Sequence, residues 1–248
     1  MLVEAARFDF VPSAALCAAL VSGRDLLMRL GRDDKPVQKA RELFEASPES
    51  DFYTLMRAFQ FARNHSFSAE SCRRYGIHAQ TARLVEQTFA QLLQIARQQG
   101  LIKNTATGSQ TADNLTPPLS PSSPVSDDAL PRCLMTGFID QLCLRRDQGT
   151  LECELTEGRR GTLMRESVVQ SAPLFVAAVL REVAGRGTEP RTLLGLATAV
   201  KREWIEEVFP EQLAARVEHL YDRAHKRVAA VRLVRFRDLI IHLSLIHI

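Results

Sequence analysis

The chain has 248 residues, enough for two ordinary domains with buried cores. Its hydrophobic content of 46% and charged content of 25% are typical of globular proteins and exclude wholesale disorder. No apolar run approaches the roughly 20 residues that cross a bilayer, and no signal-peptide pattern is present. We therefore expect a cytoplasmic protein without a membrane partner.

The net charge is only +3, so any nucleic-acid footprint must be local. The five cysteines stand singly, and an odd number without a C-x-x-C pair argues against a disulfide framework. We predict buried free thiols in a reducing compartment. The six histidines also stand apart, so no metal site is predicted.

Residues 1–102 are predicted to form a helical bundle. Ala5–Val21 is rich in Ala and Leu and ends before Gly23, whereas Ser47-Pro48-Glu49 has the chemistry of a helix start. A third helix is predicted from Ala79 to Gln99. Each of the last two helices has apolar residues that repeat with helical period on one face. In the helix after Ser47 they are Phe52, Leu55, Met56 and Phe59, and in the helix Ala79–Gln99 they are Ala82, Val85, Phe89, Leu92 and Ala96.

Residues 103–130 differ in composition from everything before them. They are rich in Ser, Thr and Asn and include Pro117, Pro118, Pro121 and Pro124. Almost nothing in this segment could be buried, so we predict a flexible linker between two domains.

Residues 131–212 are predicted to form a small barrel or sandwich with flanking helices, which makes the whole chain α+β. Leu130–Leu144 has helical spacing, and Lys201–Val208 has the pattern of a terminal helix. The predicted strands alternate with period two or form short apolar runs, and they are Thr150–Thr156, Thr162–Val169, Pro173–Val183 and Thr192–Val200. Glu157–Gly161 is predicted to be a turn, and Ala229–Ile241 has a β-like composition.

The motifs of nucleotide hydrolysis and of common hydrolases are missing from the sequence. It has no G-x-x-x-x-G-K-[ST], no D-E-x-H, no H-E-x-x-H and no G-x-S-x-G. We therefore predict no catalytic residue in this chain.

Three segments of the first half resemble the helicase-associated domain of DEAH-box RNA helicases. They are Asp51–Phe61 (DFYTLMRAFQF), Cys72–Ile77 (CRRYGI) and Gln91–Leu93 (QLL). In that family a Gln-Leu pair follows nineteen residues after a Trp-Cys pair, and the spacing from Cys72 to Gln91 agrees. The chain departs from the family at Ser71, His78 and Gln80, where the family often has Trp, Asn and Arg, so the RNA contact of that Arg has no counterpart here.

The second half is similar to the oligonucleotide-binding (OB) fold of the same family. The similar segments, in order, are Cys133–Phe138 (CLMTGF), Arg165–Val169 (RESVV) and Ala199–Pro210 (AVKREWIEEVFP). Tyr221–Leu233 resembles the extra C-terminal region of HrpB-like helicases. The resemblance implies a ratchet-like helical domain over 1–102, an OB-like barrel over 131–212 and a basic extension over 213–242.

The resemblance also implies a function. The chain would be the accessory C-terminal region of an ATP-dependent RNA helicase that guides single-stranded RNA toward motor domains absent from this chain. ATP and Mg would belong to those motor domains, its partners in cis, and this chain would hold no cofactor. The candidate phosphate contacts are the following basic residues: Arg63, Arg73, Arg74, Arg159, Arg160, Arg165, Lys226, Arg227, Arg232 and Arg235. The last four lie in Arg216–Arg237, where seven basic residues against two acidic ones give a local charge of +5.

Two alternatives stay open. Any of these arginines can be merely solvated on a helix, a turn or a β-ribbon. The chain as a whole can instead be a free-standing helical and β module that binds proteins and no nucleic acid.

Residues 243–248 (LSLIHI) are predicted to be a non-native tail. They are apolar, carry no turn or helix signal, and match what one reading frame of a common sequencing-library transposase adapter encodes. The alternative is a genuine terminal edge strand.

Overall fold

We analysed a computed structural model that describes residues 1–31, 33–45, 47–102, 128–184, 191–222 and 227–246. The chain divides into two compact units, Met1–Gly137 and Phe138–Ile248. The linker predicted over 103–130 lies almost wholly outside the described residues. Its last residues, Ala129 and Leu130, already belong to a helix.

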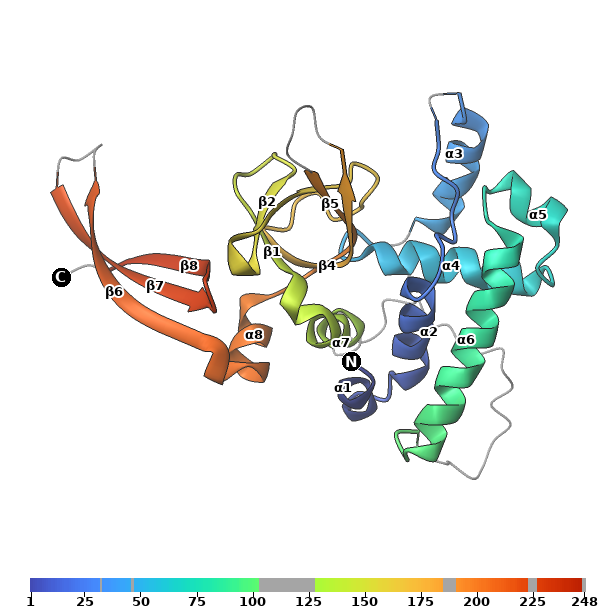
Figure 1. Ribbon diagram of the computed structural model, residues 1–248, viewed down its shortest axis with the longest axis horizontal. Coiled ribbons are helices and arrows are strands. Elements are labelled where there is room, and N and C mark those ends of the chain that lie inside the picture. The colour runs from blue at the N-terminus through green and yellow to red at the C-terminus, as the bar shows by residue number, and fades with distance from the viewer. Residues whose placement is uncertain (32, 46, 103–127, 185–190, 223–226, 247–248) are drawn as a thin grey trace. The chain divides into compact units, whose positions relative to one another are not determined.

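The first unit is helical (Figure 1). Its helices are α1 (Leu2–Arg7), α2 (Val11–Val21), α3 (Lys35–Arg41), α4 (Asp51–Asn64), α5 (Ala69–Arg74) and α6 (Ala79–Gln98), followed by α7 (Ala129–Phe138). The single helix predicted over Ala5–Val21 is wrong, because the chain breaks at Asp9, which has a φ of 60°. Pro12 then occupies the first turn of α2, where its missing N–H is tolerated.

Helix α4 begins three residues later than the sequence predicted. Its N-cap is Ser50, whose hydroxyl accepts a hydrogen bond from the Phe52 N–H, and Ser47 lies outside the helix. The predicted stripe of α4 is confirmed, because all four of its apolar residues are buried. In α6 the stripe is also confirmed, except that Leu93 rather than Leu92 is its buried leucine.

Helix α7 packs within the helical unit. Its Cys133 shares a buried cluster with Ala5, Val11, Ala14 and Ala96. The helix predicted to run to Leu144 ends at Phe138, and Leu142 starts the first strand.

The second unit begins with a closed five-stranded barrel (Figure 1). The strands are β1 (Leu142–Arg145), β2 (Glu152–Leu155), β3 (Arg160–Leu163), β4 (Leu174–Val183) and β5 (Arg191–Ala199). They pair in the order β1-β2-β3-β5-β4, β4 closes on β1, and only β3 and β5 pair in parallel. Of the four predicted strands, the second, Thr162–Val169, is the least accurate, because β3 starts at Arg160 and ends at Leu163.

The inward side chains of these strands form one apolar core. Cys143, Leu155, Leu163, Phe175 and Leu194 are among its members, each at most 1% exposed. Alternation along short strands produces this core, since every second residue faces the barrel interior.

A three-stranded antiparallel sheet follows the barrel. Helix α8 (Arg202–Val208) leads to β6 (Leu213–Asp222), β7 (Arg227–Phe236) and β8 (Leu239–Ile246), paired in the order β6-β7-β8. The helix predicted over Lys201–Val208 is therefore confirmed as a helix but does not end the fold. The β-like composition of Ala229–Ile241 is confirmed as well, and residues 243–246 form the end of β8.

Candidate nucleic-acid interface

Nine of the ten predicted phosphate contacts lie in the described residues, in three parts of the chain. Arg63, Arg73 and Arg74 belong to the helical unit, and Arg159, Arg160 and Arg165 belong to the barrel. Arg227, Arg232 and Arg235 lie on β7. Lys226 is outside the described residues, and of Arg227 only the backbone is described.

Of the three arginines predicted as phosphate contacts in the helical unit, only two are exposed to solvent. Arg63 is half-buried and forms an ion pair with Glu86 at 3.4 Å, which ties α4 to α6. Arg73 and Arg74 are exposed at the end of α5, whose N-cap is Ser68. Arg74 lies 5.8 Å from the Tyr75 ring centroid. Arg63 is thus a structural residue, and Arg73 and Arg74 are the accessible pair.

Arg159 is held by its own turn. Its Nε donates to the Thr156 carbonyl at 3.2 Å, an Nη donates to the Asp140 carbonyl at 3.2 Å, and Glu157 lies at 3.8 Å. Arg160 on β3 and Arg165 beyond it are exposed. Arg159 therefore organises the barrel, and Arg160 and Arg165 are better placed to meet a ligand.

The outer surface of the first barrel strands is nearly balanced in charge. Arg146 lies 3.5 Å from Glu152 and 3.7 Å from Glu154, and Arg160 stands opposite Glu154 in the β2–β3 ladder. Carboxylates at these positions repel a phosphate backbone. This surface is therefore a weak site for RNA.

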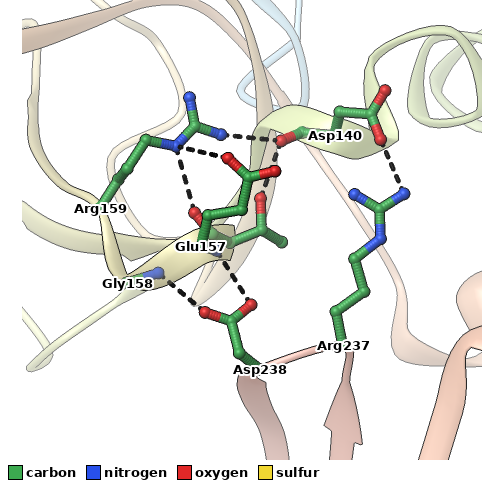
Figure 2. Close-up of polar contacts among 7 residues, drawn as sticks. Asp140, Glu157, Gly158, Arg159, Arg237 and Asp238 are labelled. Atoms are coloured by element: carbon green, nitrogen blue, oxygen red, sulfur yellow. Dashed lines mark hydrogen bonds and ion pairs between the residues drawn. The ribbon is translucent and has the colours of Figure 1, made fainter.

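Figure 2 shows the contact that fastens the sheet to the barrel within the second unit. The Asp238 carboxylate, at the β7–β8 turn, accepts hydrogen bonds from the Glu157 N–H at 2.9 Å and the Gly158 N–H at 2.8 Å. Arg237 reaches Asp140 at 2.7 Å. Both Glu157 and Gly158 have φ of 65°, which turns their two N–H groups toward one acceptor, as in backbone nests that bind anions. We call this group the Asp238 latch.

These hydrogen bonds affect the acidity of Asp238. The Glu157 N–H holds the pKa of the Asp238 carboxyl below its ordinary value, and the Gly158 N–H and the Arg237 guanidinium act in the same direction. Because the folded pKa is depressed, the latch is fully formed above the ordinary Asp pKa. It is lost as the pH falls through the depressed value.

We expect the Glu157 and Gly158 amide resonances to titrate together at a pH below the ordinary Asp pKa, with the Asp238 carboxyl. An NMR pH titration measures this directly. Asp238→Asn should remove the titration of both amides, and Asp147→Asn, in the β1–β2 loop, should leave it unchanged. A shared midpoint at or above the ordinary Asp pKa contradicts the latch.

The β6–β7–β8 sheet separates its charges between two faces. Glu218, Arg216 and Arg235 lie on one face, where Glu218 is 2.5 Å from Arg216 and 3.6 Å from Arg235. Arg232 lies on the other face and is exposed. Of the predicted contacts on β7 with described side chains, Arg235 is thus neutralised by an acid, and Arg232 is available.

Some residues of this unit were missed at the sequence level. Arg237 and Asp238 separate two β-like runs, so the pair could have been predicted as a hairpin turn. Their contacts with Asp140 and Glu157 had no sequence signal, since Glu157 and Asp238 are 81 residues apart.

The cysteines are shielded from solvent. All five are free thiols, which confirms the predicted buried free thiols. Burial raises the pKa of Cys133 to about 11 and raises that of Cys143 as well. Among the described residues no group of His, Cys, Asp and Glu is placed to hold a metal ion.

No family model matches the chain, and no curated protein matches it. In the described part of the chain, every helix is too short or too polar to cross a membrane.

Proposed function

We propose that this chain is the accessory C-terminal region of an ATP-dependent DEAH-box RNA helicase, which binds single-stranded RNA and guides it to motor domains in cis. The motor domains would bind ATP and Mg. The chain would contribute binding surface and no catalytic residue. The sequence resemblance suggests this function, and the strand topology of the barrel is the structural observation that best supports it.

The barrel supports an OB fold. Five strands, closure of β4 on β1 and parallel pairing of β3 with β5 are the arrangement of that fold, which binds oligonucleotides in several unrelated proteins. A shared fold does not by itself establish function, so the site must supply the chemistry. In the second unit that chemistry is offered by the exposed Arg165 and Arg232, since the exposed Arg160 stands opposite Glu154. The helical unit offers Arg73 and Arg74 by itself.

The alternative, a protein-interaction module without nucleic-acid binding, is favoured by one observation. The outer surface of β2 carries Glu152 and Glu154, which engage Arg146. An OB fold that binds nucleic acid through this surface would be expected to carry fewer acids there. An affinity for RNA that falls steeply as salt rises favours the helicase function, whereas salt-independent binding to a protein favours the interaction module.

We expect the purified chain to bind single-stranded RNA with an affinity that falls as salt rises, because phosphate contacts release counterions. Arg232→Ala should reduce the slope of log K against log salt by about one unit, and Arg235→Ala by less, since Glu218 already neutralises Arg235. Fluorescence anisotropy across a salt series measures both slopes.

Arg63→Ala is the matched control, because Arg63 is engaged by Glu86 and should leave the slope unchanged. Absence of RNA binding at low salt, or an affinity that does not depend on salt, would contradict the proposed function. It would favour the protein-interaction module.

A further inference from the structure

One face of the sheet formed by β6, β7 and β8 combines an exposed aromatic ring with exposed apolar groups and a cation, whereas the other face exposes aliphatic Leu243 and Leu245. The strand register places Tyr221 opposite Val228, Val217 opposite Arg232, and Arg232 opposite Ser244, so these side chains share a face. Tyr221 is 62% exposed, Val228 65% and Val217 54%. We call this surface the Tyr221 face, and its described members include Val217, His219, Tyr221, Val228, Arg232 and Ser244.

None of the described residues on the Tyr221 face is an acid. The register puts Glu218 on the opposite face with its two arginines, and no Asp or Glu of the described strands alternates onto the Tyr221 side. Arg232 is exposed there with the apolar Val217 beside it. This combination of an unopposed cation and an exposed aromatic ring is unlike the charge-balanced surface of the barrel.

One end of the same face is fixed to the rest of the unit. Phe236 and Leu239 are buried, and the Phe236 ring lies 6.2 Å from that of Phe209. The Asp238 latch holds the adjoining turn. The exposed part of the face is therefore an extension of an anchored sheet, which limits the entropy lost when a ligand is bound.

We propose that the Tyr221 face is a stacking platform for unpaired nucleotides, with a base on the Tyr221 ring and a backbone phosphate on Arg232. An exposed aromatic ring and a cation on one face, with no carboxylate among the described residues of that face, suit sequence-tolerant binding of a single strand. Val228 and Arg232 are four residues apart on β7, about 13 Å along the strand. The base and the phosphate therefore belong to different nucleotides of one strand. This inference rests on the proposed function and assigns it a site.

The test compares two labelled strands of equal length, an oligouridylate and an abasic oligonucleotide, each binding to the full chain. Tyr221→Ala should weaken oligouridylate binding on the order of 5- to 100-fold and leave abasic binding unchanged, because only the base is stacked. Tyr221→Phe should retain the affinity, since the ring is kept. Arg232→Ala should weaken both strands, because both carry phosphates.

Leu243→Ala is the matched control, since Leu243 lies on the opposite face and is similarly exposed, at 51%. If the unmodified chain binds oligouridylate and Tyr221→Ala binds it equally well, the platform is overturned while the proposed function stands. An equal loss on both strands for Tyr221→Ala also overturns it, since a fold defect does not distinguish bases. If the unmodified chain binds neither strand, both proposals fail.

Discussion

Replacing Arg145 with alanine is expected to lower the free energy of unfolding of the barrel unit by about 3–5 kcal/mol. Arg145 lies on β1, and its side chain is among the few charged ones that the barrel buries, at 7% exposed. Its loss would leave several carbonyl groups without their donor. It would also leave a cavity beside the Phe175 ring.

The contacts of Arg145 explain the size of this effect. Its guanidinium donates to the carbonyls of Val169 at 3.0 Å and Ala172 at 3.2 Å, and to that of Thr150. Its Cζ is 5.8 Å from the centroid of the Phe175 ring. One side chain thus holds the loop between β1 and β2 and the segment between β3 and β4, neither of which has a helix or strand of its own. Hydrogen bonds to a charged donor contribute about 1.5–3 kcal/mol each, and they are not additive.

Urea unfolding followed by the fluorescence of Trp204 measures this loss. Trp204 is the only tryptophan and is buried in α8, within the second unit. Arg146→Ala is the control, because the neighbouring Arg146 makes only surface ion pairs and should cost less than about 1 kcal/mol. Equal effects of the two substitutions would show that the carbonyl contacts of Arg145 do not stabilise the barrel.

The pair of Arg145 and Arg146 also shows where sequence reasoning stops. Two adjacent arginines look alike in the sequence, but Arg145 ends β1 with its side chain buried, and Arg146 follows the strand with its side chain at the surface. The start of β1 was itself missed, because Leu134, Phe138 and Leu142 continue a helical spacing past the end of α7. Whether each arginine side chain is buried or exposed depends on that strand boundary, and the hydrophobic periodicity of the sequence does not locate the boundary.

Local patterns were a better guide to helices. The stripes of α4 and α6 follow from a period of 3.6 residues and one buried side, so composition and spacing predict them together. The errors lie at helix ends. Ser47 and Ser50 are both good N-caps, and the choice of Ser50 depends on how the folded chain approaches α4. The break at Asp9 has no Gly or Pro at that residue to announce it.

The candidate interface was predictable only in part. The basic residues of a segment can be counted in the sequence, but whether an arginine is free to bind a phosphate depends on its ion-pair partners in the folded chain. Arg235 faces Glu218 and Arg232 does not, which follows from the register of β6 against β7. Tyr221 was inside the same segment and was missed as a site residue, although an aromatic residue in a basic β-ribbon is a recognisable signal for binding single strands.

In the helical unit the largest expected effect belongs to Phe89, a residue that the sequence alone placed in the core. Phe89→Ala should lower the free energy of unfolding of this unit by about 3–5 kcal/mol, as for other large-to-small changes in a packed core. Phe89 is 2% exposed on α6, and its ring meets the Phe59 ring of α4 edge to face, with centroids 6.5 Å apart. Both rings would lose packing, since the backbone of two helices cannot collapse fully into the cavity.

Urea unfolding followed by far-ultraviolet circular dichroism measures this change, because the helical unit holds most of the helix in the described chain. Phe89→Leu should cost much less than Phe89→Ala, since leucine fills most of the same space. Leu84→Ala on the same helix is the control. Leu84 is 55% exposed, so its truncation should change stability by less than about 0.5 kcal/mol. If Leu84→Ala proved as costly as Phe89→Ala, the exposed side of α6 would be packed against something in solution, and the buried stripe would not be the main source of stability in this unit.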